Sequence, residues 1–271
     1  MFVKILEGLP RRLRRFLGDT AYRMFLKKGS SLVNLFSVLL FGSGIKVKLV
    51  RKGMYLARVG ELKLLVPSAA VWGIYEILWD EVYEHVFKVK QGDKVIDVGA
   101  EFGLFTVKAA KAVREKGLVI AIEPHSGSMA ILSENVKNNN LKNVLLVQKA
   151  IGSQGGKAKL YLPYKSTLRV GKEYIDVDVD TLDNIAKELK LGKVDFIKID
   201  VEGAELEVLR GANKILSSPN IKLAIAAYHN LSDGTPEFQK ILSYLRSKRM
   251  RVWTKDSLFI YAKTCARCHG T

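Results

Sequence analysis

The period of the hydrophobic positions changes twice along the chain. Residues 1–44 place apolar residues at helical spacing between basic ones, which predicts one or two basic amphipathic helices that end at Gly42-Ser43-Gly44. From Ile45 to Val66, three segments alternate apolar and polar residues and are separated by glycines, which predicts a small antiparallel meander. Large apolar residues then recur at helical spacing from Val71 to Phe87, which predicts a helix leading into the next region.

Beyond residue 91 short apolar runs alternate with longer helical segments. Strands are predicted at residues 94–99, 118–123, 144–151, 196–200 and 221–228. Helices are predicted at residues 104–116, 128–139, 181–190, 203–216 and 236–249. Two further pairs of segments predict an inserted hairpin (158–162 with 174–180) and an antiparallel edge pair (251–254 with 258–263). Strand–helix alternation with short loops predicts an α/β fold, namely a doubly wound, mostly parallel sheet with helices on both faces.

Charge is unevenly spread over the parts that this pattern defines. These parts are a basic helical arm (1–44), a meander and helix (45–90), a sheet domain (91–264) and a tail (265–271). The net charge is +17, and the first sixty residues hold thirteen Lys or Arg but only Glu7 and Asp19 as acids. Such an arm suits an anionic partner, whether nucleic acid, anionic lipid headgroups or a phosphorylated substrate; the alternative is a solvated extension.

Targeting signals are not evident in the first part of the chain. The first residues, MFVKILEGLPRRLRRF, lack the apolar region and the cleavage site of a secretory signal peptide. The longest apolar run, Ser31 to Phe41, is shorter than the roughly 20 residues that span a bilayer. We expect it to pack on the main domain or to lie on a membrane surface. The protein is therefore expected in the cytoplasm, with association at the inner membrane surface as the alternative.

Both cysteines lie in the tail TCARCHGT. Two cysteines are too few for a disulfide framework, so a reducing compartment is expected. The spacing Cys265-x-x-Cys268-His269 matches a c-type haem attachment site, but the tail leaves no room for a haem pocket. A structural zinc ion needs four ligands, and only three are local. We therefore expect a frayed tail and assign no metal.

The first strand of the alternating region ends in a glycine loop, Asp97-Val98-Gly99-Ala100-Glu101-Phe102-Gly103. A dinucleotide site would instead show G-x-G-x-x-G, whose glycines and helix start accommodate a pyrophosphate. An acid at the start of the loop repels phosphate but suits a cation such as S-adenosylmethionine (AdoMet). The second strand ends in Glu123-Pro124, where a carboxylate can accept both ribose hydroxyl hydrogens. Together the two features favour AdoMet over a dinucleotide.

Four segments resemble FkbM-type methyltransferases: VIDVGAEFGLFTVKAA, VIAIEPHSGSMAILSENVKNNN, VDVDTLDNI and DFIKIDVEGAELEVLRGA. The resemblance covers about two-thirds of the chain, from Val71 to Arg210 and beyond, and leaves the arm outside it. It implies a seven-stranded, Rossmann-like class I methyltransferase fold, AdoMet as donor, and O-methylation of a hydroxyl on a sugar, glycan, glycolipid or secondary metabolite. By motif, the methionine end would meet Asp97, Gly99, Ala100 and Gly103, and the ribose would meet Glu123 with Pro124.

One position departs from the pattern of class I methyltransferases. Many of them carry an acid after the third strand that contacts adenine, whereas this chain has Gln148-Lys149-Ala150-Ile151. Backbone amides near Ala150 and the His125–Ser126 loop are therefore expected to hold the adenine.

Charged residues gather where the fourth strand ends, in FIKIDVEGAE. Methyl transfer to an alcohol needs alignment and removal of a proton, so Asp200 is the first candidate for a base or a metal ligand, with Glu202 beside it. His229, at the end of the fifth strand, is either a base near neutral pH or a satisfied loop histidine. Glu205 is either catalytic or a favourable acid at a helix N-terminus.

Structural roles are the main interpretation for the other polar and aromatic residues near the predicted site. Lys198 shares a strand face with Asp200 and needs a buried carboxylate partner, for which Asp183 is the candidate. Trp72, Tyr75 and Tyr83 could cover the cofactor or the acceptor, although such a stripe is more often core.

Two other functions remain open. An RNA methyltransferase would use the basic arm, but the polar-Pro-Pro-aromatic motif of base N-methylation does not follow the fourth strand, so a nucleic-acid partner is disfavoured. A non-catalytic membrane- or glycan-binding module would use a degenerate scaffold, and the intact set Asp97, Gly99, Gly103 and Glu123 argues against degeneracy. The leading hypothesis is an AdoMet-dependent O-methyltransferase that acts on a small-molecule or glycan acceptor.

Overall fold

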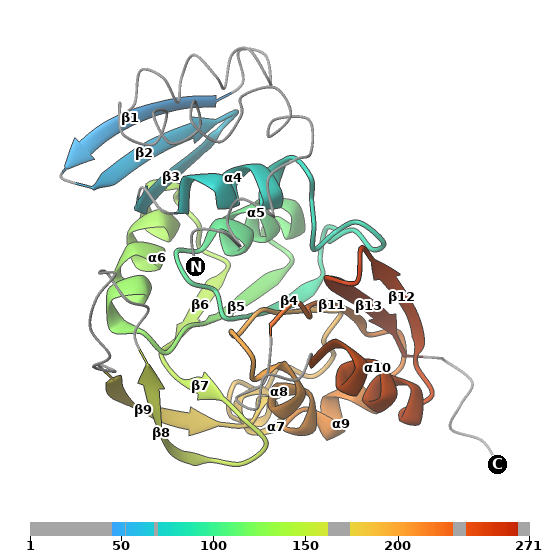
Figure 1. Cartoon of the computed structure of the whole chain (residues 1–271). Helices are drawn as coiled ribbons and strands as arrows, with labels where there is room; N and C mark the ends of the chain where they lie inside the picture. The colour runs from blue at the N-terminus through green and yellow to red at the C-terminus, as the bar shows by residue number, and fades with distance from the viewer. Residues whose placement is uncertain (1–44, 52, 68–69, 162–173, 230–236, 265–271) are drawn as a thin grey trace, which may run out of the picture. The chain divides into compact units, whose positions relative to one another are not determined.

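The computed structural model describes residues 45–51, 53–67, 70–161, 174–229 and 237–264 (Figure 1). They fall into two compact units that divide between Val71 and Trp72. The predicted basic arm, its apolar run Ser31–Phe41 and the cysteine tail lie outside the described residues. No described helix is long and apolar enough to cross a membrane.

The first unit contains the predicted meander. Three antiparallel strands follow one another in the order β1-β2-β3. Their bounds are β1 Ile45–Arg51, β2 Met54–Val59 and β3 Leu62–Pro67. Ala57, Leu64 and Val66 are buried, so the apolar positions of the alternating pattern lie on an inner face.

The second unit is built on a seven-stranded sheet with the order β12-β13-β11-β10-β4-β5-β6. Five neighbouring strands are parallel, and β13 runs antiparallel to β11 and to the edge strand β12. The bounds are β4 Lys94–Val98, β5 Leu118–Ile122, β6 Val144–Val147, β10 Phe196–Ile199, β11 Lys222–Ala226, β12 Arg251–Lys255 and β13 Phe259–Lys263. The seven-stranded, mostly parallel class I methyltransferase fold and its antiparallel edge pair are therefore confirmed.

Helices cover both faces of this sheet, as predicted (Figure 1). Their bounds are α4 Val71–Leu78, α5 Leu104–Val113, α6 Ser126–Asn138, α7 Leu182–Glu188, α8 Glu205–Arg210, α9 Asn213–Leu216 and α10 Glu237–Ser247. Successive side chains of a strand point to opposite faces of the sheet, so β10 contributes to both helical layers. Ile197 and Ile199 pack among α7 to α10, whereas Phe196 packs with α5 on the other face. Both cores are continuous and apolar.

A small third sheet, in the order β7-β9-β8, contains the predicted hairpin. Its strands are β7 Ala150–Ile151, β8 Gly156–Tyr161 and β9 Tyr174–Asp180. The antiparallel register places Lys157 opposite Asp178. The predicted third strand, 144–151, is therefore divided, because its last two residues pair with β9 and not with β5.

Two helix predictions were wrong in extent. The helix predicted to reach Phe87 ends at Leu78, because the backbone of Glu81 adopts a left-handed φ of 48° that an α-helix excludes. The helix predicted over 203–216 is split into α8 and α9 at Gly211. There the chain passes so close to Gly152 that an added Cβ would lie 2.1 Å from its carbonyl oxygen.

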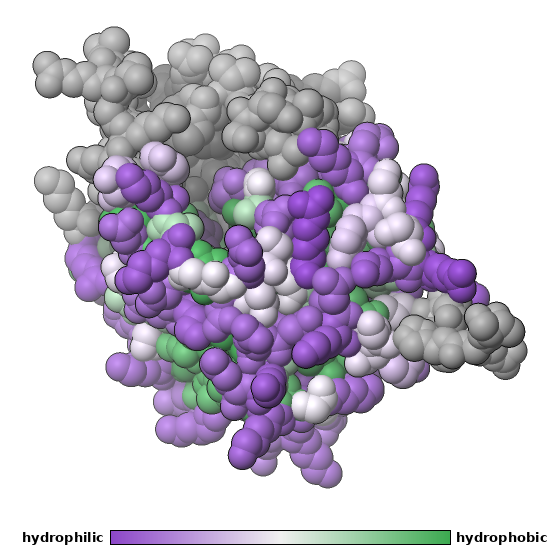
Figure 2. All heavy atoms as spheres, turned by 90° about the horizontal axis from the view of Figure 1, so that it is seen from below, coloured by the Kyte–Doolittle hydropathy of each residue, from purple (hydrophilic) through white to green (hydrophobic). Residues whose placement is uncertain are grey.

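Figure 2 shows one face of the molecule, on which the described residues are mostly hydrophilic and the hydrophobic ones form small separate groups. Single apolar side chains on a surface are ordinary in soluble folds.

Candidate functional site

The parallel strands bring the predicted site residues to one edge of the sheet. The strand β10 lies between β4 and β11, and the register pairs Ile199 with Val98 on one side and with Ile225 on the other. The residues that follow these strands therefore meet beyond their carboxyl ends, where such sheets bind ligands. They are the glycine loop after β4, Asp200 after β10 and His229 after β11.

The glycine loop is held by backbone contacts that only glycine allows. Gly99 has a φ of 74°, and its N–H and that of Ala100 donate to the Ile122 carbonyl, each at 3.0 Å. A Cβ at Gly99 would lie 1.8 Å from the carbonyl oxygen of Asp200. Gly103, with a φ of 80°, is the N-cap of α5 and lies against Leu132. The loop thus fixes the backbone that leads into Asp200.

Gly99→Ala should therefore destabilise the fold more than alanine at a comparable glycine. Gly92 is the matched control, because its φ is 83° but no atom lies within 4 Å of an added Cβ. We expect Gly92→Ala to lower the free energy of unfolding by about 1–2 kcal/mol and Gly99→Ala by about 2–5 kcal/mol. Urea denaturation of both variants measures this, and equal losses would contradict the close approach of the two loops.

Lys198 is buried and pairs with Asp97, not with Asp183 as predicted. Its Nζ lies 3.1 Å from Asp97 Oδ1 and donates to the Gly99 carbonyl at 2.5 Å. Asp97 is fully buried, and its Oδ2 accepts the Thr106 hydroxyl at 2.6 Å. Asp183 instead accepts the N–H groups of Lys214 and Ile215 at the start of α9. Asp97 therefore supports the loop from inside the fold, and its predicted contact with AdoMet stays a prediction.

Glu123 links the glycine loop to the loop after β5. Its two carboxylate oxygens accept the N–H groups of Glu101 at 2.9 Å and His125 at 2.8 Å. Burial raises the pKa of Glu123, and these two hydrogen bonds oppose the shift. Each oxygen keeps a second lone pair, so Glu123 can still accept a ribose hydroxyl. Pro124 follows directly and is partly buried.

The predicted adenine contacts lie on two separate elements. His125 is the N-cap of α6, where its Nδ1 accepts the Ser128 N–H at 3.1 Å. Ala150 begins β7 and pairs with Val179. Whether both meet the adenine stays a prediction.

Asp200 is the best placed acid at this edge. Its Oδ2 accepts the hydroxyl of the buried Tyr83 at 2.5 Å, whereas its Oδ1 is buried without a hydrogen-bond partner. Burial raises the pKa of Asp200, although Lys198 opposes the shift. Tyr83 was expected to be core or to cover the cofactor or acceptor. Its ring packs edge-on against Phe105 at 5.5 Å, which is a core contact, and its role as cover stays a prediction. The side chain of Trp72 lies outside what the structure describes.

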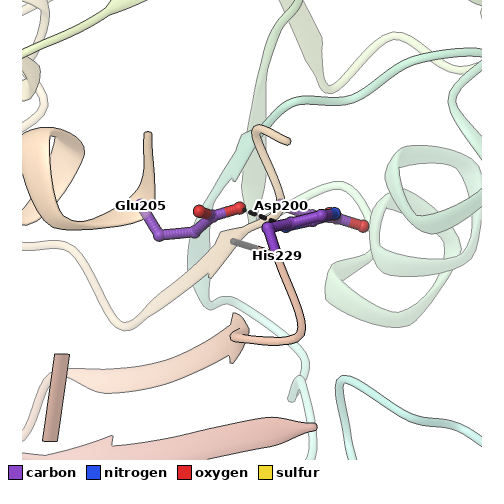
Figure 3. A group of neighbouring side chains, drawn as sticks. All are labelled: Asp200, Glu205 and His229. Atoms are coloured by element: carbon purple, nitrogen blue, oxygen red, sulfur yellow. Dashed lines mark hydrogen bonds and ion pairs between the residues drawn. The ribbon is translucent and has the colours of Figure 1, made fainter. Parts of the chain in front are cut away.

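His229 lies beside Asp200 and Glu205 (Figure 3), and Glu202 is also near its ring. Its Nδ1 is 2.9 Å from Glu205 Oε1, and its Nε2 is 3.3 Å from Glu202 Oε2 and 4.0 Å from Asp200 Oδ1. Burial acts to lower the pKa of His229, but the hydrogen bonds to Glu202 and Glu205 outweigh it and raise the pKa to about 10. The ring is therefore an imidazolium at neutral pH, which does not fit the predicted base near pH 7.

The two glutamates beside His229 differ in burial. The Glu202 side chain is 86% exposed, so solvent screens its charge, whereas Glu205 is fully buried. Glu205 also accepts the N–H groups of Val201 and Gly203, each at 3.0 Å. Its position in the first turn of α8 also fits the predicted role of an acid at a helix N-terminus. These contacts fix the Glu205 carboxylate, which therefore anchors the His229 ring.

Sequence reasoning missed two further acids at this edge, Glu76 on α4 and Glu101 in the glycine loop. Partial desolvation raises the pKa of each to about 7; the charge of Asp200 adds to both shifts, and Lys198 opposes the one at Glu101. Glu101 also has a left-handed φ of 49°, which no pattern in the sequence predicts. The site is thus rich in carboxyl groups, with Lys198 and His229 as the nearby cations.

Asp200, Glu205 and His229 also form a group of metal-ligand type, since each offers an atom within 4.8 Å of the others. Glu205, however, already accepts two backbone N–H groups and the imidazole. That leaves Asp200 Oδ1 and His229 Nε2 as the available ligand atoms, and His229 would first have to lose its proton. The arrangement suits proton transfer better than metal binding.

A family model matches more than half of this chain, and several known proteins resemble it. The model of the methyltransferase FkbM domain matches residues 97–252. Methyltransferase sdnD of Sordaria araneosa is 28% identical over an alignment of 176 positions, which covers 51% of this chain and 67% of that protein. Methyltransferase 1 of Beauveria bassiana is 25% identical over an alignment of 218 positions, which covers 69% of this chain and 85% of that protein. A crystal structure of methyltransferase FkbM from Methylobacillus flagellatus aligns at 20% identity with a TM-score of 0.48, covering 72% of this chain and 54% of that one.

Proposed function

Because the chain belongs to the family of FkbM methyltransferase domains, whose methyl donor is AdoMet, we propose that it methylates a hydroxyl group. The acceptor in this proposal is a sugar, a glycan or glycolipid, or a secondary metabolite. The observation that carries it is Asp200, whose Oδ1 is buried and without a hydrogen-bond partner where the parallel strands end. Such an atom suits the proton of an acceptor hydroxyl.

The residues at the site fit AdoMet, which is a sulfonium cation with ribose hydroxyls and no phosphate. Glu123 offers lone pairs to the ribose, and the carboxyl groups of Asp200 and Glu101 supply negative charge near a cation. When bound, the donor supplies an electrophilic methyl group; alignment, exclusion of water and removal of the proton fall to the protein.

The proposed chemistry gives Asp200 the role of general base. The acceptor oxygen forms a bond to the methyl carbon as the bond from that carbon to sulfur breaks, and the hydroxyl proton passes to Asp200 Oδ1. Tyr83 holds the other oxygen, so the carboxylate is fixed in one orientation. The raised pKa of Asp200 makes it a stronger base than an ordinary aspartate. His229, as an imidazolium 4.0 Å away, favours the ionised form of Asp200 before the transfer.

The charge of the site favours an acceptor that is not itself anionic. Asp200, Glu76, Glu101 and Glu202 all lie at this edge and would repel a phosphate brought next to them. This supports a neutral hydroxyl compound and counts against RNA, whose backbone supplies one phosphate for each nucleotide.

Transfer of a radiolabelled methyl group tests the proposed acceptor class. The full chain is incubated with labelled AdoMet and a metabolite and RNA extract of the organism that encodes it, with and without ribonuclease. We expect label in a small-molecule or glycan fraction that ribonuclease does not change. Label that disappears from the macromolecular fraction after ribonuclease treatment would support RNA methylation instead.

We also propose that the basic arm, which lies outside the described residues, contacts an anionic membrane surface. The support is its charge, which includes Arg11, Arg12, Arg14 and Arg15 within five positions. Changing these four arginines to glutamate should reduce co-sedimentation with phosphatidylserine vesicles, and the difference should shrink at high salt. Equal sedimentation of the two proteins at low salt would refute the contact.

A further inference from the structure

Glu237 is a second buried carboxyl group near Glu205, the residue that anchors the His229 ring. Glu205 begins α8, Glu237 begins α10, and both are fully buried. The two helices pack against each other, and Glu237 Oε1 accepts the Leu206 N–H at 2.8 Å. The backbone N–H of Glu237 also donates to the His229 carbonyl at 3.3 Å. Glu237 is thus hydrogen-bonded to the backbone of His229 and to that of Leu206, the residue that follows Glu205.

Two adjacent carboxyl groups in a dry interior do not both ionise, so one of them carries a proton. Hydrogen bonding decides which one. Glu205 accepts three donors, from Val201, Gly203 and His229, which stabilise its ionised form. Glu237 accepts the Leu206 N–H at Oε1, and its buried Oε2 has no donor. A proton on Oε2 removes this deficit, because the resulting O–H can donate to Glu205.

We propose that Glu237 is a positioning residue that stays protonated, donates its hydrogen to Glu205, and thereby fixes the carboxylate that holds His229 Nδ1. The role of His229 beside Asp200 rests on the proposed function, whereas the shared proton does not. Burial and the neighbouring Glu205 raise the pKa of Glu237 to about 8. Burial acts to raise the pKa of Glu205, but hydrogen bonds to His229 and Glu237 outweigh it and lower the pKa to about 2.

The charged groups that act most strongly on Glu237 are Glu205 and His229. Glu207 and Arg210 of α8 pair with each other at the surface. The strands packed on α10 carry only basic residues among their charged positions, namely Arg251, Lys255 and Lys263. Glu205 is therefore the acid that keeps the proton on Glu237.

Denaturation across pH tests the shared proton. The pKa of Glu237 rises from 4.5 to about 8 on folding, so the stability that its proton supplies is complete below pH 4.5 and is lost as pH rises towards 8. Glu237→Gln cannot ionise but keeps a donor. The urea midpoint of this variant should therefore rise relative to wild type between about pH 5 and pH 8. A constant difference between the two proteins over this range would overturn the proposal.

The histidine spectrum tests the positioning. The full chain has four histidines, so ¹⁵N-labelled histidine gives few signals, and His229→Asn identifies the one of His229. We expect a slowly exchanging Nδ1 proton in wild type and in Glu237→Gln. Glu237→Leu, which keeps volume but donates nothing, should exchange about tenfold faster. Equal exchange in all three proteins would overturn the role of Glu237; if Glu237→Leu does not fold, the comparison of wild type with Glu237→Gln across pH decides.

AdoMet titration of the same proteins separates this inference from the proposed function. A shared proton in a chain that does not bind AdoMet would support the inference while contradicting the function. Binding of AdoMet together with a pH-independent difference in urea midpoint between wild type and Glu237→Gln would support the proposed function while contradicting the inference.

Discussion

Asp200→Asn should lower kcat/KM for methyl transfer by about 10²–10⁴-fold, the range expected when a general base is lost. The asparagine keeps the shape of the side chain and can still accept the Tyr83 hydroxyl, but it cannot take a proton from the acceptor. Affinity for AdoMet should change far less, since the residues predicted to hold the ribose and methionine remain. Rates are measured with the acceptor that labelled AdoMet identifies.

The pH dependence distinguishes loss of a base from loss of structure. Asp200 acts when ionised, so the wild-type rate should rise with pH through its pKa, which lies above that of an ordinary aspartate. This rise should be absent in Asp200→Asn. Asp178→Asn is the matched control, because the Asp178 side chain is 69% exposed and lies on β9, and its rate should equal that of wild type. A rate for Asp200→Asn within threefold of the control would remove Asp200 from catalysis.

Lys198→Met should lower the free energy of unfolding by about 3–5 kcal/mol, the cost of leaving one partner of a buried ion pair uncompensated. The Lys198 side chain is 5% exposed, and Asp97 is fully buried. Methionine keeps the volume of the chain but leaves the Asp97 charge without its cation and the Gly99 carbonyl without its donor. Urea denaturation measures the loss.

An exposed lysine provides the control for this substitution. Lys193 pairs with Asp195 but is 68% exposed, so Lys193→Met should cost less than about 1 kcal/mol. Adding Asp97→Asn to Lys198→Met should recover part of the loss, because it removes the buried charge. Similar losses in the two lysine variants would mean that the buried pair is not important for stability.

Much of the fold was predictable because its signals are local. The alternation of strands and helices, the hairpin of β8 and β9 and the edge pair of β12 and β13 follow from hydrophobic periods within short windows. The site was located for a similar reason, since parallel strands carry the residues at their carboxyl ends to one edge.

The partners within the site were harder to predict, because they depend on which strands are neighbours. Lys198 and Asp97 are opposite each other on β10 and β4, yet they are far apart in sequence, and the nearer Asp183 was predicted as the partner. The charge state of His229 depends on Glu205, and that of Glu205 on Glu237. No local pattern indicates such a chain of contacts between the starts of α8 and α10.

Gly99 and Gly103 show a different limit of prediction from the sequence. The sequence predicted that Gly99 and Gly103 let a ligand approach the backbone. In the structure the nearest atoms to their missing side chains belong to Asp200 and Leu132, so the fold itself requires both glycines. A pattern that is expected for ligand binding can thus reflect packing between loops.

The central claim is that the methyl group goes to an oxygen atom. Its most direct test is ¹³C NMR of the product that the full chain forms from AdoMet labelled at the methyl carbon, with the acceptor that it selects from the extract. We predict the chemical shift of a methoxy carbon in the wild-type reaction and its loss with Asp200→Asn. The shift of a methyl carbon bound to nitrogen or to carbon would contradict the account.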